Sequence, residues 1–181
     1  MALKILATAD LHIGMKFSSY PEVQAKLAEA RSRTLSRLID RANREGCGLF
    51  LIAGDLFERV TVPKNTVLEV AALLDEFQGA CLAVLPGNHD YYSSGSSSLW
   101  KLFKEKKGAR VLLLDRQEPC GLGHYGLNVV LYPGPCTAKH ARENAISWIH
   151  EPRRDGEAGT EIDPETLHIG LAHGSIAGMS L

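Results

Sequence analysis

The chain has 181 residues, of which 45% are apolar, and a formal net charge of −1. This length and apolar content are enough for one globular domain with its own core, so we expect a single domain over residues 1–181. The balanced charge gives no general electrostatic reason to expect a nucleic-acid partner. No apolar run can span a bilayer, no export signal is evident, and the four cysteines form no CxxC pair. We therefore expect a reduced, cytoplasmic protein with no membrane association.

Strand-like and helix-like patterns alternate along the first half of the chain. The first strand is expected to be central in its sheet, and the first helix runs from Pro21 to about Glu45, where Gly46 ends it. Pro63 suits the first turn of the second helix. In this half the sequence predicts strands over residues 3–9, 49–53 and 80–85 and helices over 21–45 and 63–77.

The second half continues the alternation with shorter elements. Thr137 can cap a helix, and the charged, glycine-bearing stretch 151–163 is typical of a surface loop. The predicted elements here are helices over 99–107 and 137–150 and strands over 110–114, 127–132 and 167–172. The whole pattern indicates an α/β layered domain with a largely parallel sheet, whose functional groups collect at the carboxyl ends of the strands.

Four arginines recur on one side of the first predicted helix, opposite its apolar positions. We favour a solvated helix face as their interpretation, and keep a track for a phosphate backbone as the alternative. These residues are Arg33, Arg37, Arg41 and Arg44.

Polar side chains follow four of the predicted strands. Any one of them alone is weak evidence, because a strand-end aspartate is often a cap and a lone histidine is often structural. Four in succession, each at a carboxyl end, indicate a shared site. They are Asp10 with His12, Asp55 after Gly54, the triplet Asn88-His89-Asp90, and His173 before Gly174.

These residue types indicate metal chemistry. Oxygen and nitrogen donors without a thiolate suit Mn²⁺, Fe, Zn²⁺ or a mixed pair of ions. Two such ions about 3.5–4 Å apart hold a phosphoryl oxygen and generate hydroxide near neutral pH. Asp55 is the natural bridging carboxylate, with Gly54 allowing a close backbone approach. His89 is placed to protonate a leaving oxygen, with Asp90 orienting its ring.

At these residues the sequence resembles a known family. Asp10-Leu11-His12, Gly54-Asp55, Gly87-Asn88-His89-Asp90 and His173-Gly174 resemble the first four motifs of the calcineurin-like metallophosphoesterases. The residues of three of these motifs are similar to those of one branch, the SbcD-type DNA-repair exonucleases. These motifs are Ala9–Gly14, Ala53–Phe57 and Pro86–Asp90. The resemblance runs from the first strand to the last residue.

The resemblance implies a role for each matching residue. Asp10 and His12 would bind the first metal, Asp55 both metals, and Asn88 and His173 the second. His89, supported by Asp90, would be the general acid or would stabilise the transition state. The implied cofactors are two divalent ions, with Mn²⁺ favoured over Fe and Zn²⁺. The implied fold is a metallophosphoesterase-like layered core with mixed β-sheets flanked by helices.

The implied function is metal-dependent hydrolysis of phosphodiester bonds in DNA, as an exonuclease or endonuclease in DNA repair. DNA, a coiled-coil ATPase subunit and a second copy of the chain are the partners that the resemblance suggests. Two alternatives stay open: a phosphodiesterase or phosphatase for a small-molecule or protein substrate, and a catalytically incompetent scaffold. The family's final Gly-His-x-His motif does not occur in the 181 residues. We therefore expect an incomplete domain, truncated on its C-terminal side, with weakened metal sites and low activity.

Overall fold

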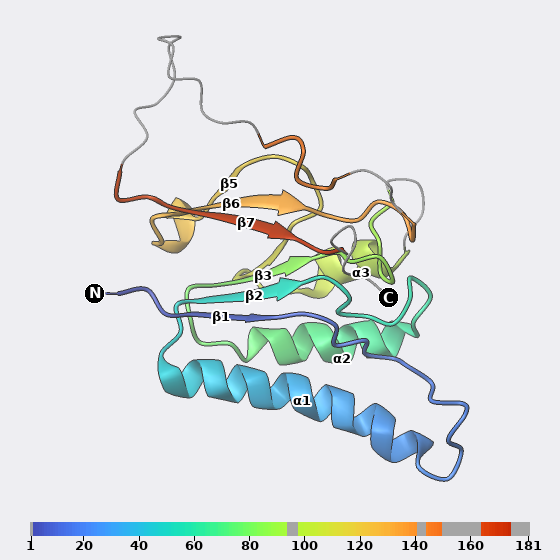
Figure 1. Ribbon diagram of the computed structural model, residues 1–181. Coiled ribbons are helices and arrows are strands. Elements are labelled where there is room, and N and C mark those ends of the chain that lie inside the picture. The colour runs from blue at the N-terminus through green and yellow to red at the C-terminus, as the bar shows by residue number, and fades with distance from the viewer. Residues whose placement is uncertain (1, 94–97, 141–143, 150–163, 175–181) are drawn as a thin grey trace.

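Two β-sheets and a layer of helices form the fold. The computed structural model describes residues 2–93, 98–140, 144–149 and 164–174 (Figure 1). The larger sheet lies in the middle, with the smaller sheet on one face and helices α1 and α2 on the other (Figure 1). This arrangement confirms the predicted α/β layered fold.

The larger sheet is parallel throughout, with the strand order β1-β2-β3-β4. Its carboxyl edge therefore collects the residues that follow each strand. The strands are β1 (Ile5–Thr8), β2 (Leu49–Ala53), β3 (Cys81–Leu85) and β4 (Val111–Leu113).

The smaller sheet is mixed, as expected. β6 (Val129–Gly134) lies between β5 (Cys120–Gly121), with which it is antiparallel, and β7 (Leu167–Ala172), with which it is parallel. The register pairs Gly134 with Ala172, so β7 ends immediately before His173.

Local sequence features explain where the first two helices begin or end. α1 (Gln24–Glu45) ends at Gly46, whose left-handed backbone caps the last turn through bonds to the carbonyls of Ala42 and Asn43. α2 (Lys64–Asp75) begins directly after Pro63. The remaining helical segments are α3 (Ser98–Lys106) and the 3₁₀ turn η1 (Gly123–Tyr125).

Alternation along β2 places the core on both sides of the larger sheet. Phe50 and Ile52 pack with the helices, whereas Leu49 and Leu51 pack between the two sheets. Because both faces of the larger sheet are covered, β2 has apolar residues at consecutive positions. This burial fixes the central strands, and with them the loops at their carboxyl ends.

Two sequence predictions are wrong. β1 lies at an edge of its sheet among the described strands, because alternating apolar residues report covered faces and not the number of neighbouring strands. The described residues of 137–150 form bends and turns in place of a helix. There the Ile146 N–H bonds to Asn144 Oδ1 at 3.1 Å, so a local side-chain contact competes with the helical ladder.

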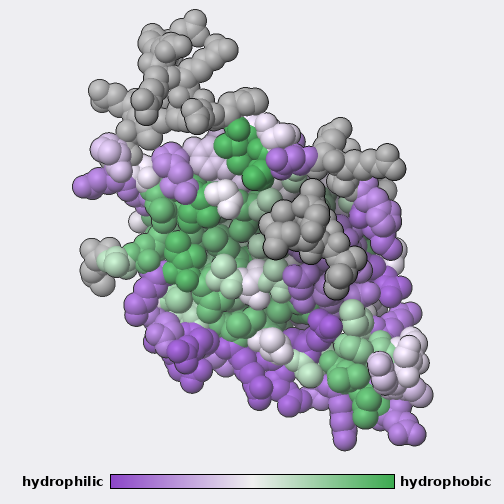
Figure 2. Space-filling view, viewed as in Figure 1, coloured by the Kyte–Doolittle hydropathy of each residue, from purple (hydrophilic) through white to green (hydrophobic). Residues whose placement is uncertain are grey.

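The surface supports the milder interpretation of the arginine stripe. Arg33 pairs with Glu29 and Arg41 with Glu45 within α1, as expected for a solvated helix face. Apolar side chains gather on the face shown in Figure 2. Ile5 on β1 and Leu167 on β7, which are edge strands among the described ones, are 36% and 43% exposed. All four cysteines are unpaired. No helix in the described part of the chain is both long and apolar enough to cross a membrane.

Candidate metal centre

The loops after β1 and β2 are bonded to each other along their backbones. The N–H of Asp10 donates to Gly54 O at 3.2 Å, and the N–H of His12 donates to Asp55 O at 2.9 Å. The parallel pairing thus continues beyond the strands. It brings the first two motifs side by side at the carboxyl edge of the sheet.

Three of the expected ligands have an uncommon backbone conformation. Asp10, His12 and Asp55 have φ values of 57°, 46° and 53°, in the left-handed region that non-glycine residues seldom adopt. Such conformations persist where the surroundings fix them, and they concentrate at functional sites. Here the backbone bonds between the two loops provide that restraint.

The carboxylate of Asp55 is the centre of the cluster. Its Oδ1 accepts the backbone N–H of His89 at 2.9 Å. Its Oδ2 lies 3.7 Å from Nε2 of His12 and 3.3 Å from Nε2 of His173. Since Oδ2 faces both histidines, Asp55 could help to hold a metal ion on either side.

The remaining expected ligands, Asp10 and Asn88, lie next to His12 and His173 respectively. Asp10 Oδ1 lies 3.6 Å from Nε2 of His12, and Asn88 Oδ1 lies 3.0 Å from Nε2 of His173. Donor atoms bound to one ion at about 2.0–2.2 Å are separated by distances of this order. The structure therefore brings together all five residues that the sequence proposed as ligands, and their donor atoms fit divalent ions.

Two glycines make space for these side chains. A Cβ on Gly54 would lie 2.3 Å from the ring of His173, and a Cβ on Gly87 would lie 2.2 Å from Oδ1 of Asp55. Gly54 also has a φ of 90°. A close backbone approach is predicted at Gly54 from the sequence, and His173 is the group that Gly54 approaches.

The electrostatics of the site favour charge on Asp55 and His173. The hydrogen bond to Asp55 raises the pKa of His173 to about 9, although burial opposes the shift. Burial works against ionisation of Asp55, but hydrogen bonds from His173 and His89 outweigh it and lower the pKa of this carboxyl. A divalent ion would replace the proton shared between these groups.

His89 lies beside the ligand cluster. Its ring packs edge-on against His12, with centroids 4.8 Å apart, and its Nδ1 lies 3.0 Å from the carbonyl oxygen of Glu58. Because a carbonyl only accepts hydrogen bonds, this contact assigns a proton to Nδ1. Nε2 is then the ring nitrogen left to exchange a proton with a substrate.

Asp90 does not orient the ring of His89, which corrects the expectation from sequence. Its Oδ2 accepts the N–H of Phe57 at 2.9 Å, and its Oδ1 accepts the N–H of Gly87 at 2.7 Å. The side chain is fully buried beneath the site. The physical reason is chain direction: Asp90 turns inward to satisfy buried backbone groups while His89 faces the cluster.

Sequence reasoning missed two residues near the site. Glu58 contacts both His12 and His89, and its only sequence signal is a charged residue directly after the apolar pair Leu56-Phe57. Arg31 reaches from α1 to the carbonyl of Leu11 at 2.8 Å, between two expected ligands. No motif marks this arginine, because its role depends on how α1 packs.

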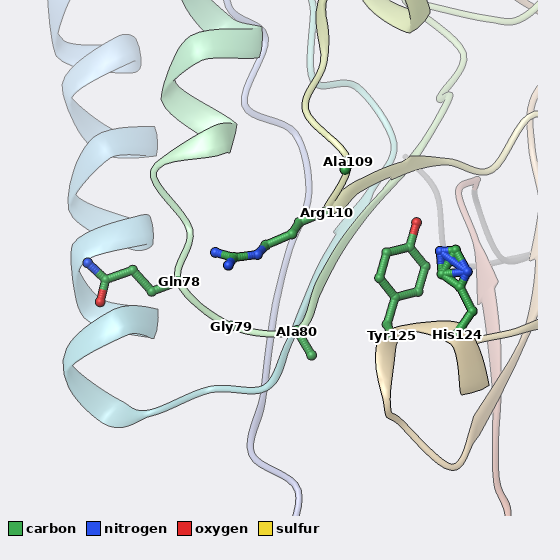
Figure 3. A pocket seen from close by; sticks show the side chains of 7 residues that line it. All are labelled: Gln78, Gly79, Ala80, Ala109, Arg110, His124 and Tyr125. Carbon is green, nitrogen blue, oxygen red and sulfur yellow. The ribbon is translucent and has the colours of Figure 1, made fainter.

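A pocket of about 470 Å³ lies away from this cluster. It is lined by Arg110, His124 and Tyr125 among others, where β3 and β4 begin (Figure 3). That is the amino edge of the larger sheet, opposite the edge that carries the expected ligands. The candidate site is identified by the potential metal-donor atoms around Asp55 and not by this pocket.

Comparison with known proteins agrees with this geometry. Residues 3–172 match the model of the calcineurin-like phosphoesterase family. The chain belongs to this family. Its members are metal-dependent phosphoester hydrolases, which fits the oxygen and nitrogen donors gathered around Asp55.

Individual relatives of this phosphoesterase domain are distant. It is 25% identical over 183 residues to the uncharacterized metallophosphoesterase YhaO of Bacillus subtilis (strain 168), across 97% of this chain and 41% of that protein. The crystal structure of Pseudomonas putida nuclease MPE is similar with a TM-score of 0.40 and 21% identity, over 71% of this chain and 52% of that one. The chain thus spans less than two thirds of the length of either protein.

Proposed function

We propose that this domain hydrolyses phosphodiester bonds in DNA, using two divalent ions held by Asp10, His12, Asp55, Asn88 and His173. The observation that carries the proposal is the placement of Asp55 Oδ2 between Nε2 of His12 and Nε2 of His173. Family membership supports phosphoester hydrolysis. The similarity of three motifs to SbcD-type exonucleases supports DNA as the substrate and repair as the setting.

The donor set fits Mn²⁺, which we favour over Fe and Zn²⁺, because it combines carboxylate, amide and imidazole groups without a thiolate. When bound, such ions polarise phosphoryl oxygens and lower the pKa of water. Asp10 and His12 would serve one ion, Asn88 and His173 the other, with Asp55 shared. The hydrogen bond from the His89 N–H to Asp55 Oδ1 keeps the second carboxylate oxygen directed at both sides.

His89 is the proposed general acid. With Nδ1 held by the Glu58 carbonyl, its protonated ring donates from Nε2 to the leaving oxygen. Asp90 acts indirectly, by holding the backbone that carries His89. General acid catalysis of this kind contributes roughly 10²–10⁴-fold to the rate.

A second candidate function has a specific observation in its favour. The net charge is −1, and Arg33 and Arg41 are paired with glutamates, so α1 offers DNA fewer free cations than its sequence indicates. A phosphodiesterase or phosphatase for a small-molecule or protein substrate would need no basic track. A coiled-coil ATPase partner and a homodimer remain proposals that rest on the motif resemblance alone.

The test is a Mn²⁺-dependent assay of the purified chain on linear duplex DNA, single-stranded DNA and an aryl phosphodiester. The proposal expects cleavage of DNA that EDTA abolishes and that Asp55→Asn reduces at least 100-fold. Asp40→Asn, at an exposed position of α1, is the matched control. Cleavage of the aryl ester alone would favour the second candidate. Metal binding without any turnover would favour the scaffold interpretation.

A further inference from the structure

Glu58 is an acidic residue whose side chain is partly buried beside the candidate metal centre. Its side chain is only 14% exposed, and its ion-pair contacts among the described residues are with His12 and His89. A buried carboxylate without hydrogen-bond donors is costly. His89 already directs Nδ1 at the Glu58 backbone carbonyl, so His12 is the group placed to satisfy the carboxylate.

The contact with His12 is the closer one. Oε2 of Glu58 lies 3.2 Å from Nδ1 of His12. Both atoms are buried, and neither makes a hydrogen bond within the described part of the chain. They lie within hydrogen-bonding distance of each other, so each is the group placed to satisfy the other.

The other nitrogen of the same ring faces the expected ligands. Nε2 of His12 lies 3.6 Å from Asp10 Oδ1 and 3.7 Å from Asp55 Oδ2. The imidazole thus stands between Glu58 on one side and the metal-binding carboxylates on the other. An acceptor at Nδ1 decides which nitrogen carries the proton and which one is free for a metal.

The backbone fixes Glu58 relative to His12. The Glu58 N–H donates to Ile13 O at 3.0 Å, and the Ile13 N–H donates to Leu56 O at 2.9 Å. These bonds continue the bridge between Ile13 and Phe57. The carboxylate is therefore presented to the ring by two segments that are hydrogen-bonded to each other.

We propose that Glu58 is a positioning residue of the metal centre, whose carboxylate accepts the Nδ1 proton of His12 and so presents Nε2 to the metal. The proposal rests on the proposed function only in assigning His12 as a ligand. Carboxylates that hold the second nitrogen of a metal-binding histidine fix the orientation of its ring, and their loss typically costs about 10–100-fold in metal affinity. Glu58 also reaches His89 through its backbone carbonyl, which a side-chain substitution leaves in place.

The experiment compares three variants of the chain with the unsubstituted protein. Glu58→Met keeps the length of the side chain and removes the acceptor, Glu58→Gln restores an acceptor oxygen without the charge, and Glu69→Gln is a control at an exposed position of α2. Binding of Mn²⁺ and Zn²⁺ is measured by titration calorimetry. The Nδ1 proton of His12 is observed by ¹⁵N–¹H NMR with and without Zn²⁺, and circular dichroism monitors folding.

We expect Glu58→Met to bind metal 10–100-fold more weakly than the unsubstituted protein and to show an upfield shift of the His12 Nδ1 proton. Both values for Glu58→Gln should lie between those of Glu58→Met and the unsubstituted protein. Affinity within two-fold and an unchanged proton shift in Glu58→Met would overturn it. If Glu58→Met does not fold, the same two criteria apply to Glu58→Gln. Neither measurement requires turnover, so an inactive enzyme refutes the proposed function without deciding the role of Glu58. If no metal binds to the unsubstituted protein, the role proposed for Glu58 is overturned.

Discussion

Asp90 accepts a hydrogen bond from the backbone N–H of Phe57 at 2.9 Å, and so joins the loop after β3 to the loop after β2. Its other oxygen accepts the N–H of Gly87 at 2.7 Å. Burial raises the pKa of this carboxyl to about 6, and the two backbone hydrogen bonds oppose the shift. One side chain thus holds two ligand-bearing loops in register.

Replacing Asp90 should therefore destabilise the domain. Asp90→Ala leaves two buried N–H groups without an acceptor, each worth about 1–3 kcal/mol of the free energy of unfolding. Asp90→Asn keeps one acceptor and should lose less. Urea unfolding at pH 7 measures both, with Asp40→Asn as an exposed control. Equal midpoints for Asp90→Ala and the control would show that Asp90 does not join the loops.

Gly54→Ala should disrupt the metal centre more than an equal change elsewhere. The new methyl group would lie 2.3 Å from the ring of His173, which has to move away from Asp55. Metal affinity should fall at least ten-fold, as measured by titration calorimetry.

The matched control for this prediction is Gly126→Ala. Gly126 also has a positive φ, 75°, but a Cβ there meets nothing within 4 Å. This variant also places a side chain at a positive φ but without the clash, so it should lose stability and keep its metal affinity. If both variants bind metal equally well, space beside His173 is not what Gly54 provides.

The ligands could be predicted from sequence because they belong to a local pattern. Asp55 lies two residues and Asn88 three residues beyond the end of an apolar strand, and parallel strands bring their carboxyl ends together whatever the details of packing. His173 also follows a strand, but β7 belongs to the smaller sheet, so its place beside Asp55 depends on how the two sheets pack. Local periodicity and topology were sufficient for the residues of the larger sheet.

The contacts of the other two site residues, His89 and Asp90, could not be predicted in this way. The carboxylate of Asp90 turns to backbone groups of Phe57 and Gly87, and the neighbour of His89 is Glu58. Sequence proximity suggested an Asp90–His89 pair, but adjacent residues in a loop point in different directions. Which side chains meet depends on the pairing of two loops that are distant in the chain.

His173 should make the stability of the metal-free protein depend on pH. Its pKa is about 9 in the folded protein, against an ordinary value of 6.5, because of the hydrogen bond to Asp55. A raised pKa means that the folded state holds the proton more tightly. The resulting stabilisation is fully present below pH 6.5 and is lost as the pH rises from 6.5 to about 9.

Urea unfolding of the EDTA-treated protein across that pH range measures the effect. The free energy of unfolding should fall by at most about 3 kcal/mol. His173→Asn should flatten the slope, whereas His140→Asn, at an exposed position, should leave it unchanged. A slope that persists in His173→Asn would assign the proton to another group.

His89→Ala should separate catalysis from metal binding. The backbone N–H of His89 that bonds to Asp55 Oδ1 at 2.9 Å remains in the variant, so the shared carboxylate keeps its orientation. Only the ring beside His12 is lost, and with it the proposed proton donor. Turnover should fall roughly 10²–10⁴-fold while Mn²⁺ affinity changes less than about two-fold. His124→Ala, exposed on η1, is the control, and loss of metal in His89→Ala would instead make His89 a ligand.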